Sequence, residues 1–288
     1  YHMGWTGEGS GVEAAGKRIR PLLLLLTMAS CGGDWTKALP AAAAVELVHN
    51  FSLVHDDIQD NSPKRRGRPT VWVNWGAPMA INVGDALFVM SNLALTDLAR
   101  ENPPDRVLKS IQILQQTCLD LTRGQFLDMS FEERTDVKVD DYWMMVTGKT
   151  ASLLSACCHI GAVLGNTDEA TEEAYRSFGH FLGLAFQVQD DILGIWGDPG
   201  VTGKPAADDI VEAKARQYVK RYGVVFRDRW RFAEEWRLAL EAIPNVDFFQ
   251  DTVNEIITVG DKATGVITGL GITIKSKSII LTNGTFLN

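Results

Sequence analysis

The sequence has few cysteines, no excess of positive charge and no long apolar run, and each shortage narrows the range of functions. Its 288 residues include Cys31, Cys118, Cys157 and Cys158, with no CxxC spacing. This pattern predicts reduced core thiols in a cytosolic protein rather than a zinc site. The formal net charge of −8 argues against nucleic-acid binding, which requires a basic face. The negative net charge does not exclude a small anionic substrate, because basic side chains can be concentrated in one cleft.

Several motifs and segments are absent as well. The chain has no GxSxG, P-loop, HExxH or complete GxGxxG, so the chemistries that depend on them lack their signatures. No stretch reaches the roughly 18 consecutive apolar residues that a spanning helix needs, and we expect no stable membrane insertion. Lys17–Arg20 followed by Leu22–Leu26 imitates an export signal, but Pro21 suits the first turn of a helix.

The chain does contain a long helical pattern. Apolar residues make up 45% of the sequence, which is enough for a sizeable core. From Pro21 to about Ala185 they recur at spacings of three and four, and breakers such as Asn102-Pro103-Pro104 divide the pattern. We therefore predict an all-α bundle with short connections and no strand over these residues.

The pattern changes after about residue 210. Residues 211–242 are strongly charged and helix-forming, and β-rich runs with glycine turns between them follow. These runs are Val246–Phe249, Ile256–Val259, Val266–Thr268 and Ile272–Leu281. The sequence thus predicts a helical domain over 1–210, followed by a segment of different origin over 211–288.

Three carboxylates crowd one turn in His55-Asp56-Asp57-Ile58-Gln59-Asp60. On a helix, Asp56 and Asp60 lie one turn apart on the same face, with Asp57 beside them. Such carboxylates repel each other unless a cation separates them, and hard oxygen ligands suit Mg²⁺. The alternative is a solvated acidic face, but the flanking residues are apolar. A second acidic pair, Asp190-Asp191, lies on another apolar segment. We predict that the two acidic clusters lie on facing walls of one cleft.

Basic side chains accompany both acidic clusters. Arginine clamps diphosphate oxygens in a bidentate manner, whereas lysine acts as a point charge. The candidates are Lys17, Arg20, Arg65, Arg66, Lys149 and Lys204. Magnesium ligands and diphosphate clamps without a nucleophile predict ionisation, in which pyrophosphate departs and leaves an allylic carbocation.

In these motifs the sequence resembles the trans-type prenyl diphosphate synthases, over about residues 1–210. The matching motifs are Gly16–Pro21, Glu46–His49, His55–Asp60, Arg65–Gly67, Gly124–Asp128, Lys149-Thr150 and Phe186–Asp191. The resemblance implies an isoprenoid-synthase-type helical bundle and a Mg²⁺-dependent condensation of isopentenyl diphosphate with an allylic diphosphate. We expect a cytoplasmic homodimer.

The resemblance also implies residue roles. Asp56, Asp57 and Asp60 would bind Mg²⁺ and the allylic diphosphate, and Asp190 and Asp191 a further Mg²⁺. The residues implied to grip the allylic diphosphate are Arg65, Lys149, Gln187 and Lys204, with Thr150 a further substrate contact. Those implied to hold isopentenyl diphosphate are Lys17, Arg20, His49 and Arg66. Asp56, Asp57, Lys149 and Lys204 would carry catalysis. Gly194 replaces the last aspartate of the second motif, and Asp198 could serve there through water.

In the family that the sequence resembles, product length depends on what closes the channel below the first acidic cluster. Phe51 lies five residues before Asp56, and helical geometry points it under the metal site, with the small Ser52 beside it. A single aromatic residue here resembles the synthases that stop at twenty carbons. The alternative is that Phe51 is only a core contact.

The C-terminal part resembles a different family. Arg231–Arg237 and Lys275–Leu287, within about residues 227–288, are similar to an internal piece of the flavoprotein that modifies the wobble uridine of tRNA. Its dinucleotide motif is absent, so we expect no FAD site. The chain therefore resembles a composite, in which part of a synthase is joined to a fragment of a flavoprotein, either by a fusion or as an artefact. Two rival functions stay open: a class I terpene cyclase, which would not need the isopentenyl diphosphate clamp, and a catalytically silent composite chain.

Overall fold

The computed structural model describes residues 1–196, except 12, 13, 15, 132, 133 and 135, and residues 252–276, except 261. Over 192–196 it describes the backbone alone. The chain divides into two units, Tyr1–Arg221 and Tyr222–Asn288, and each is considered by itself. The predicted boundary near residue 210 lies outside the described residues and stays a prediction.

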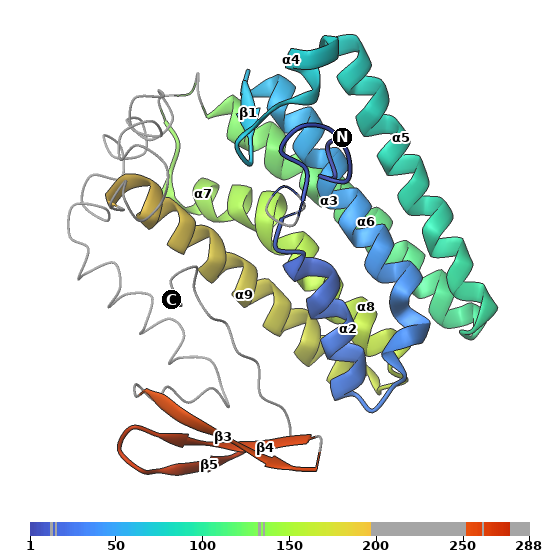
Figure 1. Ribbon diagram of the computed structural model, residues 1–288, viewed down its shortest axis with the longest axis vertical. Coiled ribbons are helices and arrows are strands. Elements are labelled where there is room, and N and C mark those ends of the chain that lie inside the picture. Colours follow the sequence, from blue (N-terminus) through green and yellow to red (C-terminus); the bar gives the residue numbers. More distant parts are fainter. Residues whose placement is uncertain are drawn as a thin grey trace. The chain divides into compact units, whose positions relative to one another are not determined.

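The first unit is a bundle of helices, as the sequence predicts (Figure 1). Its elements are α2 (Ile19–Ser30), η1 (Trp35–Ala38), α3 (Leu39–Gln59), β1 (Lys64–Arg65), β2 (Arg68–Pro69), α4 (Val71–Trp75), α5 (Ala77–Thr96), η2 (Asp97–Arg100), α6 (Pro104–Ser130), α7 (Val139–Val146), η3 (Thr147–Ala151), α8 (Ser152–Leu164) and α9 (Glu169–Trp196). The mainly all-α expectation for this unit is confirmed.

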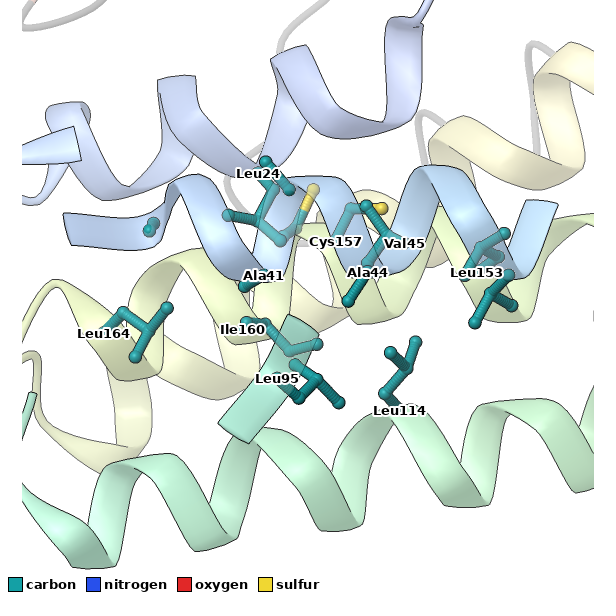
Figure 2. Packing of buried hydrophobic residues seen from close by; sticks show 14 of the residues in the cluster. Leu24, Ala41, Ala44, Val45, Leu95, Leu114, Leu153, Cys157, Ile160 and Leu164 are labelled. Atoms are coloured by element: carbon teal, nitrogen blue, oxygen red, sulfur yellow. The ribbon is translucent and has the colours of Figure 1, made fainter. Parts of the chain in front are cut away.

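The core lies where α3 and α8 meet the other helices. Helix α8 contains no Asp, Glu, Lys or Arg, and nearly all of its side chains are buried. It packs against α9, α2 and α6, while α3 packs mainly against α5 and α2. Figure 2 shows Leu24 of α2, Val45 of α3, Leu114 of α6 and Ile160 of α8, which belong to one buried apolar cluster. This packing fixes the ends of α3, α6 and α9, which carry the candidate site.

A short hairpin interrupts the helices where the sequence predicted no strand. Strands β1 and β2 pair antiparallel, with Arg65 opposite Arg68. The two residues between them, Arg66 and Gly67, have φ values of 52° and 74°. Positive φ at both positions is the geometry of tight hairpin turns, and glycine adopts it without strain. The helical periodicity could not reveal a ladder of two residues, so the expectation of no strand was wrong here.

The described part of the second unit is an antiparallel sheet of three strands. They are β3 (Val253–Val259), β4 (Lys262–Thr268) and β5 (Thr273–Lys275), in the order β3-β4-β5. Turns with positive φ at Gly260 and Gly271 connect them. The β-rich expectation is confirmed for these runs. Residues 211–242, Val246–Phe249 and the run beyond Ser276 lie outside the described residues.

The four cysteines are free thiols, and Cys118, Cys157 and Cys158 are buried in the core, as predicted, whereas Cys31 is only half-buried. Burial raises the pKa of Cys118 to about 11, so this thiol stays protonated. Among the described helices, one segment, Ala77–Arg100, is long and apolar enough by length and composition to cross a membrane. Only 22% of its most apolar window is buried within the chain, so this segment presents an unusually apolar surface.

Candidate active site

The first acidic cluster lies at the C-terminal end of α3, and the hairpin folds Arg65 back onto it. The Arg65 Nε donates to Asp57 Oδ1 at 2.6 Å, and its Nη2 donates to Asp56 Oδ2 at 3.1 Å. The Asp57 side chain is buried, and its Oδ2 has no hydrogen-bond partner within the described residues. Burial raises the pKa of Asp57 to about 6, although Arg65 opposes the shift. One oxygen therefore stays available for a cation.

Lys149 connects this cluster to α6. Its Nζ lies 2.6 Å from Asp128 Oδ2 and 3.5 Å from Asp56 Oδ1. Burial alone would lower the pKa of Lys149, but the charges of Asp128 and Asp56 raise it above its ordinary value. The ammonium group is thus held charged between two carboxylates from different helices.

The backbone that carries Lys149 is unusual. Segment η3 is a π-helix, a form that often occurs at functional sites. It approaches α6 so closely that a Cβ on Gly124 would lie 2.1 Å from the Lys149 backbone nitrogen. A Cβ on Gly148 would lie 2.7 Å from the Asp120 carbonyl oxygen. Two facing glycines therefore set the position of Lys149.

A glutamine from α6 completes the surroundings of Asp56. Gln125 Nε2 donates to Asp56 Oδ1 at 3.1 Å and to Gln59 Oε1 at 2.9 Å. Asp56 thus has donors from the hairpin, from α6 and from η3. Such a network orients a carboxylate before any ligand arrives, which reduces the reorganisation that binding requires.

The second acidic pair lies near the end of α9, in its own network. Asp191 Oδ2 accepts from the Tyr142 hydroxyl at 2.6 Å, and its Oδ1 accepts from Gln187 Nε2 at 2.9 Å. Gln187 Oε1 in turn accepts from the Thr150 hydroxyl at 2.6 Å. Burial raises the pKa of Asp191 to about 6, and the charges of Asp190 and Asp128 act in the same direction. Asp128 thus interacts with both clusters: it binds Lys149 beside the first, and its charge raises the pKa of Asp191 in the second.

A third group of predicted residues lies between α2, α3 and the hairpin. Arg20 Nη1 lies 3.3 Å from His49 Nε2. Burial lowers the pKa of His49 to about 2, with Arg20 and Arg66 contributing, so the imidazole is neutral. Arg66 donates to the Ala14 carbonyl oxygen at 3.1 Å. The structure thus brings Arg20, His49 and Arg66 together, while Lys17 lies exposed before α2.

The two predicted chain-length residues lie one turn or more before the acidic cluster. The Phe51 ring is 5.2 Å from the Phe88 ring of α5 and 5.8 Å from the His55 ring. The Ser52 hydroxyl donates to the His49 carbonyl oxygen at 2.8 Å. Phe51 therefore belongs to an aromatic pair between α3 and α5, which the sequence pattern did not indicate.

Lys204 and Asp198 lie outside the described residues, so their predicted roles stay predictions. Three further polar side chains touch the site and had no predicted role: Gln125, Asp128 and Tyr142. Gln125 and Asp128 belong to the Gly124–Asp128 motif, so the sequence carried a signal for them. Tyr142 had none, because its contact joins residues 49 positions apart.

The arrangement fits Mg²⁺ as a cofactor. No three His, Cys, Asp or Glu side chains in the described ranges converge on one metal position. Magnesium does not require such a cage, because it usually takes one or two carboxylates together with water and substrate phosphate oxygens. The unpartnered Asp57 Oδ2 beside Asp56, with Asp60 one turn further on, offers carboxylate ligands of this kind.

Comparisons with known proteins match the two parts of the chain separately. The polyprenyl synthetase family model matches residues 10–219, and the glucose inhibited division protein A model matches residues 221–288. Both predicted resemblances are thereby confirmed, the second beginning a few residues earlier than expected.

Individual relatives give the same picture for the first part. The chain is 49% identical to a geranylgeranyl diphosphate synthase of Mycobacterium tuberculosis, over 75% of this chain and 61% of that protein. It is 44% identical to a (2E,6E)-farnesyl diphosphate synthase of Mycobacterium bovis, over 74% of this chain and 59% of that protein. The chain thus spans less than two thirds of the length of these relatives.

A solved structure agrees with the fold. The geranyltransferase of Helicobacter pylori, complexed with magnesium and isoprenyl diphosphate, superposes with a TM-score of 0.67 at 29% identity. The match covers 80% of this chain and 78% of that one. Since the family model extends over most of the chain and the solved relative shares its helical bundle, this chain belongs to the polyprenyl synthetase family.

Proposed function

We propose that the chain is a Mg²⁺-dependent prenyltransferase that condenses isopentenyl diphosphate with an allylic diphosphate to give a short-chain trans-prenyl diphosphate. The observation that carries the proposal is the bridge from Arg65 through Asp56 to Lys149. It places carboxylates for a metal directly beside two cations for a diphosphate. Membership of the family and the named activities of the relatives support the same reaction.

The chain's own residues divide the work. Bound Mg²⁺ would neutralise charge on the departing diphosphate. Arg65 and Lys149 hold Asp56 and Asp57 in place, and both can turn their remaining donors to diphosphate oxygens. The cations Arg20 and Arg66, together with the neutral imidazole of His49, form a separate group for the second diphosphate. This second group favours a synthase over a terpene cyclase, which ionises a single diphosphate.

Transfer of radiolabelled isopentenyl diphosphate tests the proposal. The full chain is incubated with Mg²⁺ and with ten-, fifteen- or twenty-carbon allylic primers in turn, and products are sized by chromatography. A synthase incorporates label into longer diphosphates. A terpene cyclase would release unlabelled hydrocarbon from the primer alone, and a silent composite chain would give neither product. Either of the last two results would reject the proposal.

We propose a twenty-carbon product, with Phe51 as the floor of the channel. An apolar chain must run from the charged mouth into the bundle, and Phe51 and Phe88 lie together between α3 and α5. The relatives include both geranylgeranyl and farnesyl diphosphate synthases, so product length needs its own test.

Phe51→Ala is expected to lengthen the product by about one five-carbon unit, since it removes most of an aromatic side chain, at a cost of about 3 kcal/mol in stability. Ser52→Phe is expected to shorten it towards fifteen carbons. Product chromatography measures both shifts, and Leu108→Ala, at an exposed residue of α6, serves as the control. An unchanged product distribution in both variants, with lowered melting temperatures, would make Phe51 a core contact only.

We propose a homodimer formed through α5. Val89, Met90 and Leu93 are large, exposed and on one helix, and contiguous apolar surface of this kind marks an interaction site. A second copy would cover it without the need for a membrane.

Leu93→Asp should therefore convert the dimer to a monomer, because burying an unpaired charge costs several kcal/mol. Sedimentation velocity without detergent measures the change. Leu22→Asp makes the same substitution at an exposed residue of α2 and should leave the dimer intact. A wild-type chain that floats with lipid vesicles instead would contradict the proposed dimer face.

A further inference from the structure

The first residues of the chain are held against the hairpin by one buried arginine. Arg68 donates to three backbone carbonyl oxygens, at 2.9 Å to Tyr1, 2.7 Å to Thr6 and 3.1 Å to Glu8. Its guanidinium carbon also lies 4.1 Å from the centre of the Tyr1 ring. Only 8% of Arg68 is exposed. We call residues 1–11 the N-terminal segment, and Arg68 is its anchor.

Tyr1 makes two more contacts that hold the N-terminal segment in place. Its hydroxyl donates to the Pro69 carbonyl oxygen at 3.0 Å, and its ring meets the Trp75 ring edge-on at 5.1 Å. A guanidinium group that satisfies three carbonyls is rigid, because each bond fixes both the side chain and the segment. The anchor therefore sets the position of the residue next to Tyr1.

That residue is His2, and it faces the arginines of the hairpin. Together with Arg65, Arg66 and Arg68 it lines a small cavity with room for about one water molecule. Its Nε2 is buried and has no hydrogen-bond partner within the described residues. Burial lowers the pKa of His2 to about 4, and the charges of Arg66 and Arg65 act in the same direction. His2 is thus a neutral imidazole with one unused nitrogen.

His2 also lies beside the group assigned to isopentenyl diphosphate, because Arg66 of that group lines the same cavity. A charge on His2 would act to lower the pKa of His49, as the charges of Arg20 and Arg66 do. An unsatisfied buried nitrogen costs about 1–3 kcal/mol. This cavity has room for one oxygen of a diphosphate bound at Arg66. That oxygen would accept a hydrogen bond from the imidazole N–H, and its charge would offset the positive charges around His2.

We propose that His2 is a further positioning residue for isopentenyl diphosphate, and that Arg68 holds it in place through the N-terminal segment. This inference rests on the proposed function, since it adds a residue to the isopentenyl diphosphate pocket. It assigns to the N-terminal segment a direct part in substrate binding and leaves the ionising step to the residues at the ends of α3 and α6.

Four variants of the full chain test the inference: His2→Ala, His2→Gln, Arg68→Gln and the double variant of His2→Ala with Arg68→Gln. His2→Ala should raise KM for isopentenyl diphosphate about tenfold, as loss of one hydrogen bond to a charged group does. KM for the allylic substrate and kcat should change less than about twofold. His2→Gln keeps a donor and should restore most of the affinity. The double variant should be no worse than Arg68→Gln, because both changes act on the same contact.

His180→Ala provides a matched control, since His180 lies on α9 away from the hairpin. Circular dichroism establishes that each variant is folded. If Arg68→Gln fails to fold, the two His2 variants decide alone. Unchanged KM for isopentenyl diphosphate in His2→Ala, or equal increases for both substrates, would overturn the inference.

Calorimetric titration with isopentenyl diphosphate alone separates this inference from the proposed function. If the wild-type chain binds isopentenyl diphosphate without turning over, and His2→Ala weakens that binding, His2 keeps its role while the transferase proposal fails. If the wild-type chain turns over and His2→Ala binds as tightly as the parent, only the inference fails. If the wild-type chain neither binds nor turns over, both fail.

Discussion

Replacing Asp57 with alanine is expected to lower the rate of product formation by about three orders of magnitude at saturating Mg²⁺. Asp57 is the buried carboxylate of the first cluster, and its Oδ2 has no partner among the described residues. The substitution removes that oxygen and leaves Arg65 with Asp56 alone. Ionisation of the allylic diphosphate would then lose a metal ligand and the orientation of one diphosphate clamp together.

Single-turnover measurements with labelled isopentenyl diphosphate give the rate directly and separate chemistry from product release. Asp57→Asn keeps the shape of the side chain and one oxygen, so it should lose less activity than Asp57→Ala. Asp97→Ala is the control, because Asp97 forms an ion pair with the exposed Arg100, and exposed pairs of this kind contribute little to stability. If Asp57→Ala were to turn over at nearly the wild-type rate, the acidic cluster would not be the metal site.

The sequence predicted the helices better than the contacts between them. Spacing of three and four residues is a property of each helix, and it indicated the helical stretch from Pro21 to about Ala185. The acidic turn was evident because Asp56, Asp57 and Asp60 are close in sequence and chemically unusual. Their partners are distant along the chain: Lys149 lies 93 residues from Asp56. Residue spacing cannot predict such a pairing, and resemblance to a family could only suggest it.

Other parts of the site leave almost no trace in the sequence. The π-helix η3 is only five residues long. Over so short a stretch, the spacing of apolar residues does not distinguish a π-helix from an α-helix. Arg68 binds backbone carbonyl oxygens, which every residue possesses, so the residues it contacts form no motif. His2 gains its significance only from the burial that this anchor causes. Phe88 joins the predicted floor residue Phe51 through packing of α5 on α3, which depends on the whole bundle.

Gly124→Ala is expected to destabilise the chain by about 2–3 kcal/mol and to lower kcat about a hundredfold. The new Cβ would lie 2.1 Å from the Lys149 backbone nitrogen and 2.5 Å from the Gly148 carbonyl carbon. Backbone atoms cannot rotate away as a flexible side chain can, so α6 and η3 must move apart. The higher helix propensity of alanine, worth up to about 1 kcal/mol, offsets only part of this cost.

The same displacement explains the expected loss of activity. Separation of α6 from η3 would pull Asp128, which lies one turn beyond Gly124, away from the Lys149 ammonium that it holds at 2.6 Å. Lys149 would then lose its fixed position beside Asp56, and a misplacement of about 1 Å costs roughly a hundredfold in rate. Thermal melting and steady-state kinetics measure the two effects. Arg123→Ala, at the adjacent exposed position of α6, should change neither the melting temperature nor kcat appreciably. Parent-like melting and kcat in Gly124→Ala would mean that the two helices do not meet at these glycines, and the placement of Lys149 would be wrong.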